Sequence, residues 1–162
     1  MSMAMPRNTT STHYALAAVA VLGSALSAYA AYVGPGFRGA YGVKPMYLNY
    51  FGMFMTGAFG LGFIFATEML MRMKAKFTLF DSIHLFLGQF CGFTMVTVCY
   101  AIYALTDAAG GFRLAAIWIA GAGLLGPARF ILYMDPVLTP EGVGGDPFLI
   151  LTAGVLGVLG SM

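Results

Sequence analysis

Long apolar segments separated by short polar ones run through the whole chain. Four of these segments are residues 14–33, 47–70, 83–105 and 112–133. Each is at least as long as the ~20 residues that an α-helix needs to cross the hydrocarbon core of a bilayer. The pattern therefore predicts an all-α fold, a polytopic transmembrane helix bundle with four spans.

A last apolar segment, residues 148–162, is shorter than the other four. As a helix it would extend ~22 Å, less than the ~30 Å thickness of the hydrocarbon core. It either crosses a thinned bilayer as a fifth span, or forms a half-span, or packs along a partner. Residues 1–13 form a polar N-terminal tail, and the length of residues 14–162 suits a single transmembrane domain.

Small residues recur at every fourth position on several of the predicted spans. In lipid, such stripes let helix backbones approach closely, and packing then drives helix association. The first span is rich in them, with Ala20, Ser24 and Ala28 on one stripe, so we expect it to be central in the bundle. The candidate helix-packing residues on the other spans are Gly52, Thr56, Gly60, Gly88, Gly92, Ala122 and Gly126.

The composition agrees with a membrane protein. Hydrophobic residues make up 60% of the chain and charged residues 9%, whereas soluble domains carry ~25% charged residues. The net charge of +2 lacks the basic face that nucleic acid would require, so nucleic acid is excluded as a partner. Cys91 and Cys99 have neither the CxxC nor the Cys/His spacing of a metal site, and we predict none.

The charge is densest in the polar hinge at residues 71–82, between the second and third spans. With alternating spans, this hinge, the N-terminal tail and the end of the fourth span share one side of the membrane. That side carries five of the eight basic residues: Arg7, Arg72, Lys74, Lys76 and Arg129. The positive-inside rule then places the N-terminus on the cytoplasmic or matrix side.

Ionisable residues within or beside the spans are the candidates for chemistry, because charge is costly at membrane depth. They are Glu68, Arg72, Asp81, His84 and Arg129. Glu68 falls about one turn inside the end of the second span and precedes Arg72 by four residues, which favours an interfacial ion pair. Arg129 follows Pro127 and either extends to the interface or meets Glu68.

The two histidines raise the question of a haem. His13 and His84 begin different spans on the same predicted side, so they are candidate axial ligands. Both also stand where interfacial polar residues collect, and we favour that structural interpretation. No cofactor is predicted beyond bound structural lipids.

The chain has no Walker loop, H-E-x-x-H or G-x-S-x-G motif, so no enzymatic activity is expected. The leading hypothesis is a non-catalytic accessory subunit of a larger energy-transducing complex, such as a respiratory-chain or ATP-synthase assembly. Its partners would be other membrane subunits and lipids, in the mitochondrial or bacterial inner membrane. The alternative is a small homo-oligomeric transporter or channel, and a third hypothesis is a haem-bearing membrane anchor.

Overall fold

The computed structural model of the protein describes residues 11–36, 40–74, 80–105, 107–133 and 147–162. The side chains of residues 40, 74 and 126–133 lie outside this description. Within the described residues the regular structure is helical, with no strand, which confirms the predicted all-α fold.

Four long apolar helices and a shorter apolar C-terminal one make up most of the molecule. The long helices are α1 (Ser11–Val33), α2 (Met46–Phe65), α4 (Ser82–Ala104) and α5 (Ala108–Tyr133). The short elements are η1 (Ala40–Gly42), α3 (Thr67–Lys74) and α7 (Pro147–Ser161). The four long helices satisfy the length and hydropathy of membrane spans, as the sequence predicted.

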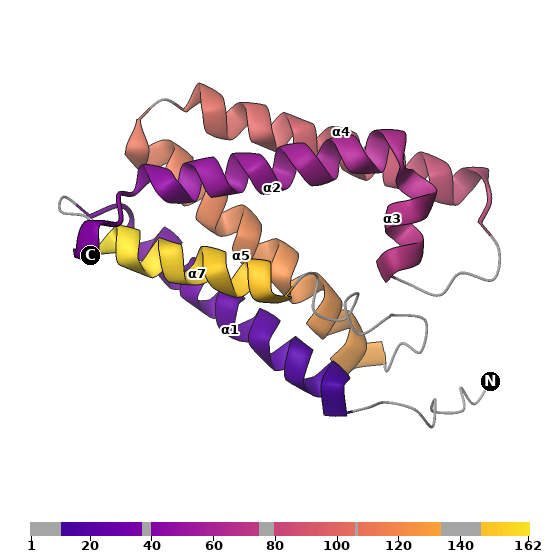
Figure 1. Ribbon diagram of the computed structural model, residues 1–162, viewed down its shortest axis with the longest axis horizontal. Coiled ribbons are helices and arrows are strands. Elements are labelled where there is room, and N and C mark those ends of the chain that lie inside the picture. The colour runs from indigo at the N-terminus through magenta and orange to yellow at the C-terminus, as the bar shows by residue number, and fades with distance from the viewer. Residues whose placement is uncertain (1–10, 37–39, 75–79, 106, 134–146) are drawn as a thin grey trace.

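The helices form two groups that diverge from one end of the molecule (Figure 1). Helix α2 packs along α4, while α1 packs along α7 and α5. Helix α5 joins the groups, since it contacts α1, α2, α4 and α7. The expectation that the first span is central is therefore wrong: α1 is built from small residues because α5 and α7 approach it closely on one side.

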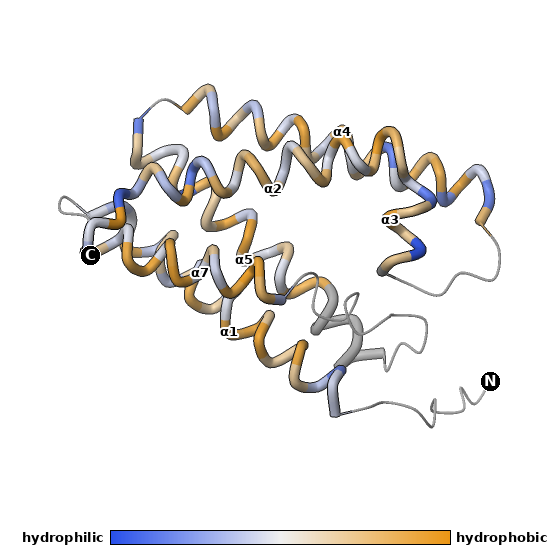
Figure 2. Tube along the Cα trace, viewed as in Figure 1, coloured by the Kyte–Doolittle hydropathy of each residue, from blue (hydrophilic) through white to orange (hydrophobic). Residues whose placement is uncertain are grey.

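The hydrophobic core lies at the end where the two groups meet. Leu48 of α2, Ile102 of α4, and Phe112 and Ile119 of α5 are each at most 2% exposed and pack in one cluster. Polar segments gather at the two ends of the bundle, around α3 and the start of α4 at one end and around the α1–α2 connection at the other (Figure 2). This distribution is the one expected of a bundle whose middle lies in hydrocarbon.

The second predicted span is interrupted, so residues 47–70 do not form one helix. Helix α2 ends at Phe65, Ala66 leaves the helical region with φ −132° and ψ 37°, and α3 starts at Thr67. The Thr67 hydroxyl donates to the Phe63 carbonyl, and Thr67 and Met71 lie against Gly88 of α4. These contacts turn α3 away from the α2 axis, as Figure 1 shows. Four residues of the predicted hinge, 71–74, are accordingly helical.

The predicted start of the fourth span at residue 112 is also wrong, because α5 begins at Ala108. The Asp107 carboxylate accepts a hydrogen bond from the Gly110 N–H, which caps the helix. Gly111 then fits inside the helix beside Asn49: a Cβ added there would lie 2.8 Å from the Asn49 amide nitrogen.

Helix α7 runs parallel to α1 and covers only part of its length. A Cβ at Gly23 would lie 2.6 Å from the Leu151 backbone nitrogen, and one at Gly157 would lie 2.9 Å from the Ala30 Cβ. At the end of α7, the Gly36 N–H donates to the Gly160 carbonyl over 2.8 Å. The last segment is therefore a short apolar helix packed against its own chain.

Candidate functional site

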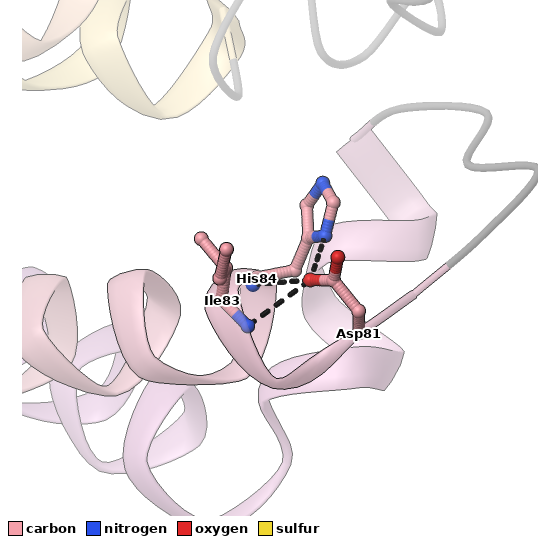
Figure 3. Close-up of polar contacts among 3 residues, drawn as sticks. All are labelled: Asp81, Ile83 and His84. Atoms are coloured by element: carbon pink, nitrogen blue, oxygen red, sulfur yellow. Dashed lines mark hydrogen bonds and ion pairs between the residues drawn. The ribbon is translucent and has the colours of Figure 1, made fainter.

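Polar side chains gather at the end of the bundle where α3 meets the start of α4. Asp81 precedes α4, and its Oδ1 accepts hydrogen bonds from the backbone N–H groups of Ile83 at 3.0 Å and His84 at 3.1 Å (Figure 3). The same oxygen lies 2.7 Å from Nδ1 of the His84 ring. Asp81 is thus the N-cap of α4, which explains why an acid stands at this position.

These contacts favour the charged form of the Asp81 carboxyl. The backbone N–H of His84 contributes most, followed by the His84 side chain, and together they lower the pKa of Asp81 from its ordinary value of 3.8. The pair is exposed, so its role in the fold is to start α4 and orient the imidazole.

Glu68 and Arg72 pair with each other on α3. The Arg72 guanidinium contacts Glu68 Oε1 through both Nε and Nη2, each at 2.8 Å, and both side chains are about half exposed. The Arg72 guanidinium also lies 5.9 Å from the centre of the Phe80 ring. Because α3 is separate from α2, Glu68 lies outside the second span, and the expectation that it sits inside that span is wrong.

The two candidate haem ligands belong to different groups of helices. His13 begins α1 and His84 begins α4, and these helices belong to different groups (Figure 1). Among the described residues, no three His, Cys, Asp or Glu side chains form a group that could hold a metal ion. Arg129 and Gly126 lie within α5, in the part whose side chains are outside the description.

Several of the predicted packing residues lie where helices touch. Gly60 and Gly92 face each other across α2 and α4: a Cβ at Gly60 would lie 2.9 Å from the Gly92 carbonyl oxygen. A Cβ at Gly52 would lie 2.9 Å from the Ala115 Cβ on α5. The Thr56 hydroxyl is buried and donates to the Gly52 carbonyl at 2.7 Å, which satisfies it within its own helix.

Two further close contacts between helices involve glycines that the spacing of small residues did not single out. Gly123 lies against α1, since a Cβ there would be 2.3 Å from Ser24 Oγ, and Gly154 lies against the Gly23 carbonyl. Ala122, singled out from the sequence, lies on the side of α5 that faces a cavity. Small residues occur on both faces of α5, so their spacing alone does not show which face packs against another helix.

That cavity has a volume of about 530 Å³. It lies between the α2–α4 pair and α5. Its lining runs from Met55 to Phe63 on α2, from Met95 to Cys91 on α4, and from Ile117 to Leu125 on α5. The lining is mainly apolar, and the Thr94 hydroxyl within it already donates to the Phe90 carbonyl at 3.0 Å.

The crossing of the helices explains the position of the cavity. Helix α5 touches α2 at Gly52 and Ala115 and then diverges from it toward the α3 end, as Figure 1 shows. On α5, the side chain that would fill the space is missing at Gly121, where a Cβ would meet no atom within 4 Å.

These features define a multi-pass integral membrane protein with an apolar cavity between its helices. In comparisons with known proteins, no family model matches the chain, and neither a curated protein nor a solved structure matches it.

Proposed function

We propose that the protein is a non-catalytic accessory subunit of a larger energy-transducing membrane complex, such as a respiratory-chain or ATP-synthase assembly. The observation that carries this proposal is the lack of charge along the spans. Helices α1, α2 and α4 contain no Asp, Glu, Lys or Arg, and α5 contains two: Arg113, about one turn from its start, and Arg129, about one turn from its end. Ion and proton pathways generally place ionisable groups at depth, so the sequence of these spans suits packing better than transport.

The outer face of α4 supports a role among other subunits. Phe86, Phe90 and Phe93 are 64–69% exposed there, and Tyr100 continues the exposed aromatic surface along the helix. Large aromatic side chains provide most of the contact area in protein interfaces. In the proposed assembly this face of α4 meets a neighbouring subunit or its bound lipids.

A homo-oligomeric transporter is the second candidate, and the cavity at depth is the observation that favours it. Transported polar species need polar groups along their path. The cavity offers an apolar lining and one hydroxyl that is already bonded within its helix. This chemistry supports the accessory subunit over a pathway for ions.

The proposed location is the mitochondrial or bacterial inner membrane, with the N-terminus on the matrix or cytoplasmic side. The distribution of lysine and arginine supports this orientation. An N-terminal tag should therefore resist protease added to the outer face of intact mitoplasts or spheroplasts. Cleavage of the tag under these conditions would reverse the orientation.

Purification from native membranes in mild detergent tests the function directly. We expect the tagged protein to elute as one large particle that contains several different subunits, without a Soret band. A particle built only from copies of this chain would favour the transporter, and a Soret band would favour the haem-bearing anchor.

Two variants test whether the exposed face of α4 holds the partner subunits. Phe93→Ala with Tyr100→Ala should release the partner subunits, because both side chains lie on the exposed face of α4. Leu22→Ala, on the exposed face of α1, is the matched control and should leave the particle intact.

A further inference from the structure

We propose that the cavity between α5 and the α2–α4 pair binds one acyl chain of an anionic phospholipid, whose head group lies beside α3. The proposal concerns a binding site within the single chain, and it does not rest on the accessory-subunit role.

The lining of the cavity determines which kind of molecule can occupy it. A buried water molecule needs two to four polar partners. The Thr94 hydroxyl is already used by the Phe90 carbonyl, and most of the remaining lining is aromatic, aliphatic or thioether. The bilayer beside the helices supplies hydrocarbon, so an apolar chain is the occupant that this lining favours.

The size and direction of the cavity fit a single chain. From Ile117 to Leu125 the lining follows α5 for ~12 Å at 1.5 Å per residue. The volume of about 530 Å³ falls within the roughly 300–1,000 Å³ typical of ligand cavities. The lining follows α2 over the same length, from Met55 to Phe63, so the cavity extends along both helices.

The distance from the level of α3 to the far end of the cavity matches the thickness of one leaflet. Phe63, at one end of the lining, lies two residues, or ~3 Å, before the end of α2, where the chain turns into α3. A chain that starts at this end of α2 and reaches the far end of the cavity spans ~15 Å, which matches the ~15 Å half-thickness of the hydrocarbon core. The head group of that lipid then lies at the level of α3.

The net charge of α3 and the segment that follows it favours an anionic head group. Residues 67–82 contain three basic residues, Arg72, Lys74 and Lys76, and two acids, Glu68 and Asp81, so the net charge is +1. Basic residues at the membrane surface attract anionic lipids by about 1 kcal/mol each, and salt screens this attraction.

The lone tryptophan makes the occupant measurable. Trp118 lines the cavity one turn before Gly121 on the same face of α5. A lipid brominated in the middle of its acyl chain quenches tryptophan fluorescence only at contact. Quenching of Trp118 therefore reports a chain in the cavity.

The test uses the purified full chain in nanodiscs of unlabelled phosphatidylcholine with a small fraction of brominated phosphatidylglycerol. Trp118 fluorescence should be strongly quenched in the wild type, and Gly121→Phe should lose most of this quenching because its ring fills the cavity. Ala122→Phe, from the same wall, should act in the same way. Leu124→Phe is the control, since Leu124 is 45% exposed and does not line the cavity.

Equal quenching in the wild type and in folded Gly121→Phe and Ala122→Phe would overturn the proposal, because Trp118 would then be sensing only the surrounding bilayer. Circular dichroism and size-exclusion profiles identify the folded variants. The head-group arm replaces brominated phosphatidylglycerol with brominated phosphatidylcholine. Quenching should be weaker with phosphatidylcholine, and the difference should shrink at high salt; equal quenching would contradict the anionic head group.

Discussion

The two faces of α5 differ sharply although each carries a glycine. Toward α1 the helix is closed: a Cβ at Gly123 would lie 2.3 Å from Ser24 Oγ and 2.6 Å from an Ile150 methyl group. Toward α2 and α4 it is open: a Cβ at Gly121, two residues earlier, would meet nothing within 4 Å.

Glycines in one membrane helix therefore have two opposite effects on packing. On the closed face its missing side chain lets two backbones approach, and packing supplies the stability. On the open face the same missing side chain leaves room for a molecule from outside the chain.

The largest effect is expected for Gly23→Leu, which extends the test of the closed face to α1 and α7. A Cβ at Gly23 would lie within 2.7 Å of three backbone atoms of Ile150 and Leu151. Because backbone cannot move aside locally, the free energy of unfolding should fall by at least about 3 kcal/mol. Denaturation in mild detergent measures this free energy, with Val21→Leu on the exposed face of α1 as the control. Equal stability of the two variants would contradict a close contact between the α1 and α7 backbones.

A somewhat smaller effect is expected for Gly92→Leu, which asks whether the α2–α4 pair is closed in the same way. A Cβ at Gly92 would lie 2.7 Å from the Gly60 carbonyl oxygen, but its other neighbours are side chains of Phe63 and Ile64 that can adjust. We expect a loss of about 2–3 kcal/mol in the same assay. Phe93→Leu, on the exposed side of α4, is the control, and a loss as large for it would argue against a specific contact.

A smaller effect with a defined pH dependence is expected at the Asp81 cap. Its folded-state pKa is lowered, so its stabilisation is fully present above the unfolded pKa of about 3.8 and is lost as the pH falls through the folded value. Asp81→Asn keeps the cap but removes the titration. The difference in unfolding midpoint between the two proteins should therefore shrink below pH ~4; a constant difference from neutral to acidic pH would exclude this contribution.

The smallest effect is expected for Glu68→Gln on α3, at the end of the bundle where the open face begins. The Glu68–Arg72 pair is exposed and four residues apart, a geometry worth about 0.3–0.5 kcal/mol. Unfolding in detergent should show a change of this size for Glu68→Gln and for Arg72→Gln alike. A loss as large as that of Gly92→Leu would make the pair a structural or functional centre.

Hydropathy was sufficient to predict the helical class and the four spans, since a chain in hydrocarbon must bond its backbone internally and helices do so within one segment. The break at Ala66 could not be predicted from it, because two polar residues, Thr67 and Glu68, are too few to end the predicted span before Leu70. The turn there depends on the Thr67 hydroxyl and on Gly88, which belongs to another helix.

Among the candidate residues, contacts within one helix could be predicted from the sequence, and features formed between helices could not. The acid-before-base spacing of Glu68 and Arg72 predicted their ion pair, since both lie on one helix. The cavity could not be predicted, because it results from the angle at which α5 leaves α2 and from the identity of the face that Gly121 occupies. Neither is encoded in the spacing of small residues along one span.

The most direct test compares Gly121→Leu with Gly123→Leu by unfolding in mild detergent. We predict that Gly123→Leu lowers the free energy of unfolding by at least about 2 kcal/mol through its clash with α1. Gly121→Leu should leave it unchanged or raise it by up to ~0.8 kcal/mol, because leucine favours the helix and has room. Equal losses in the two variants, or a larger loss for Gly121→Leu, would contradict the division of α5 into a closed and an open face.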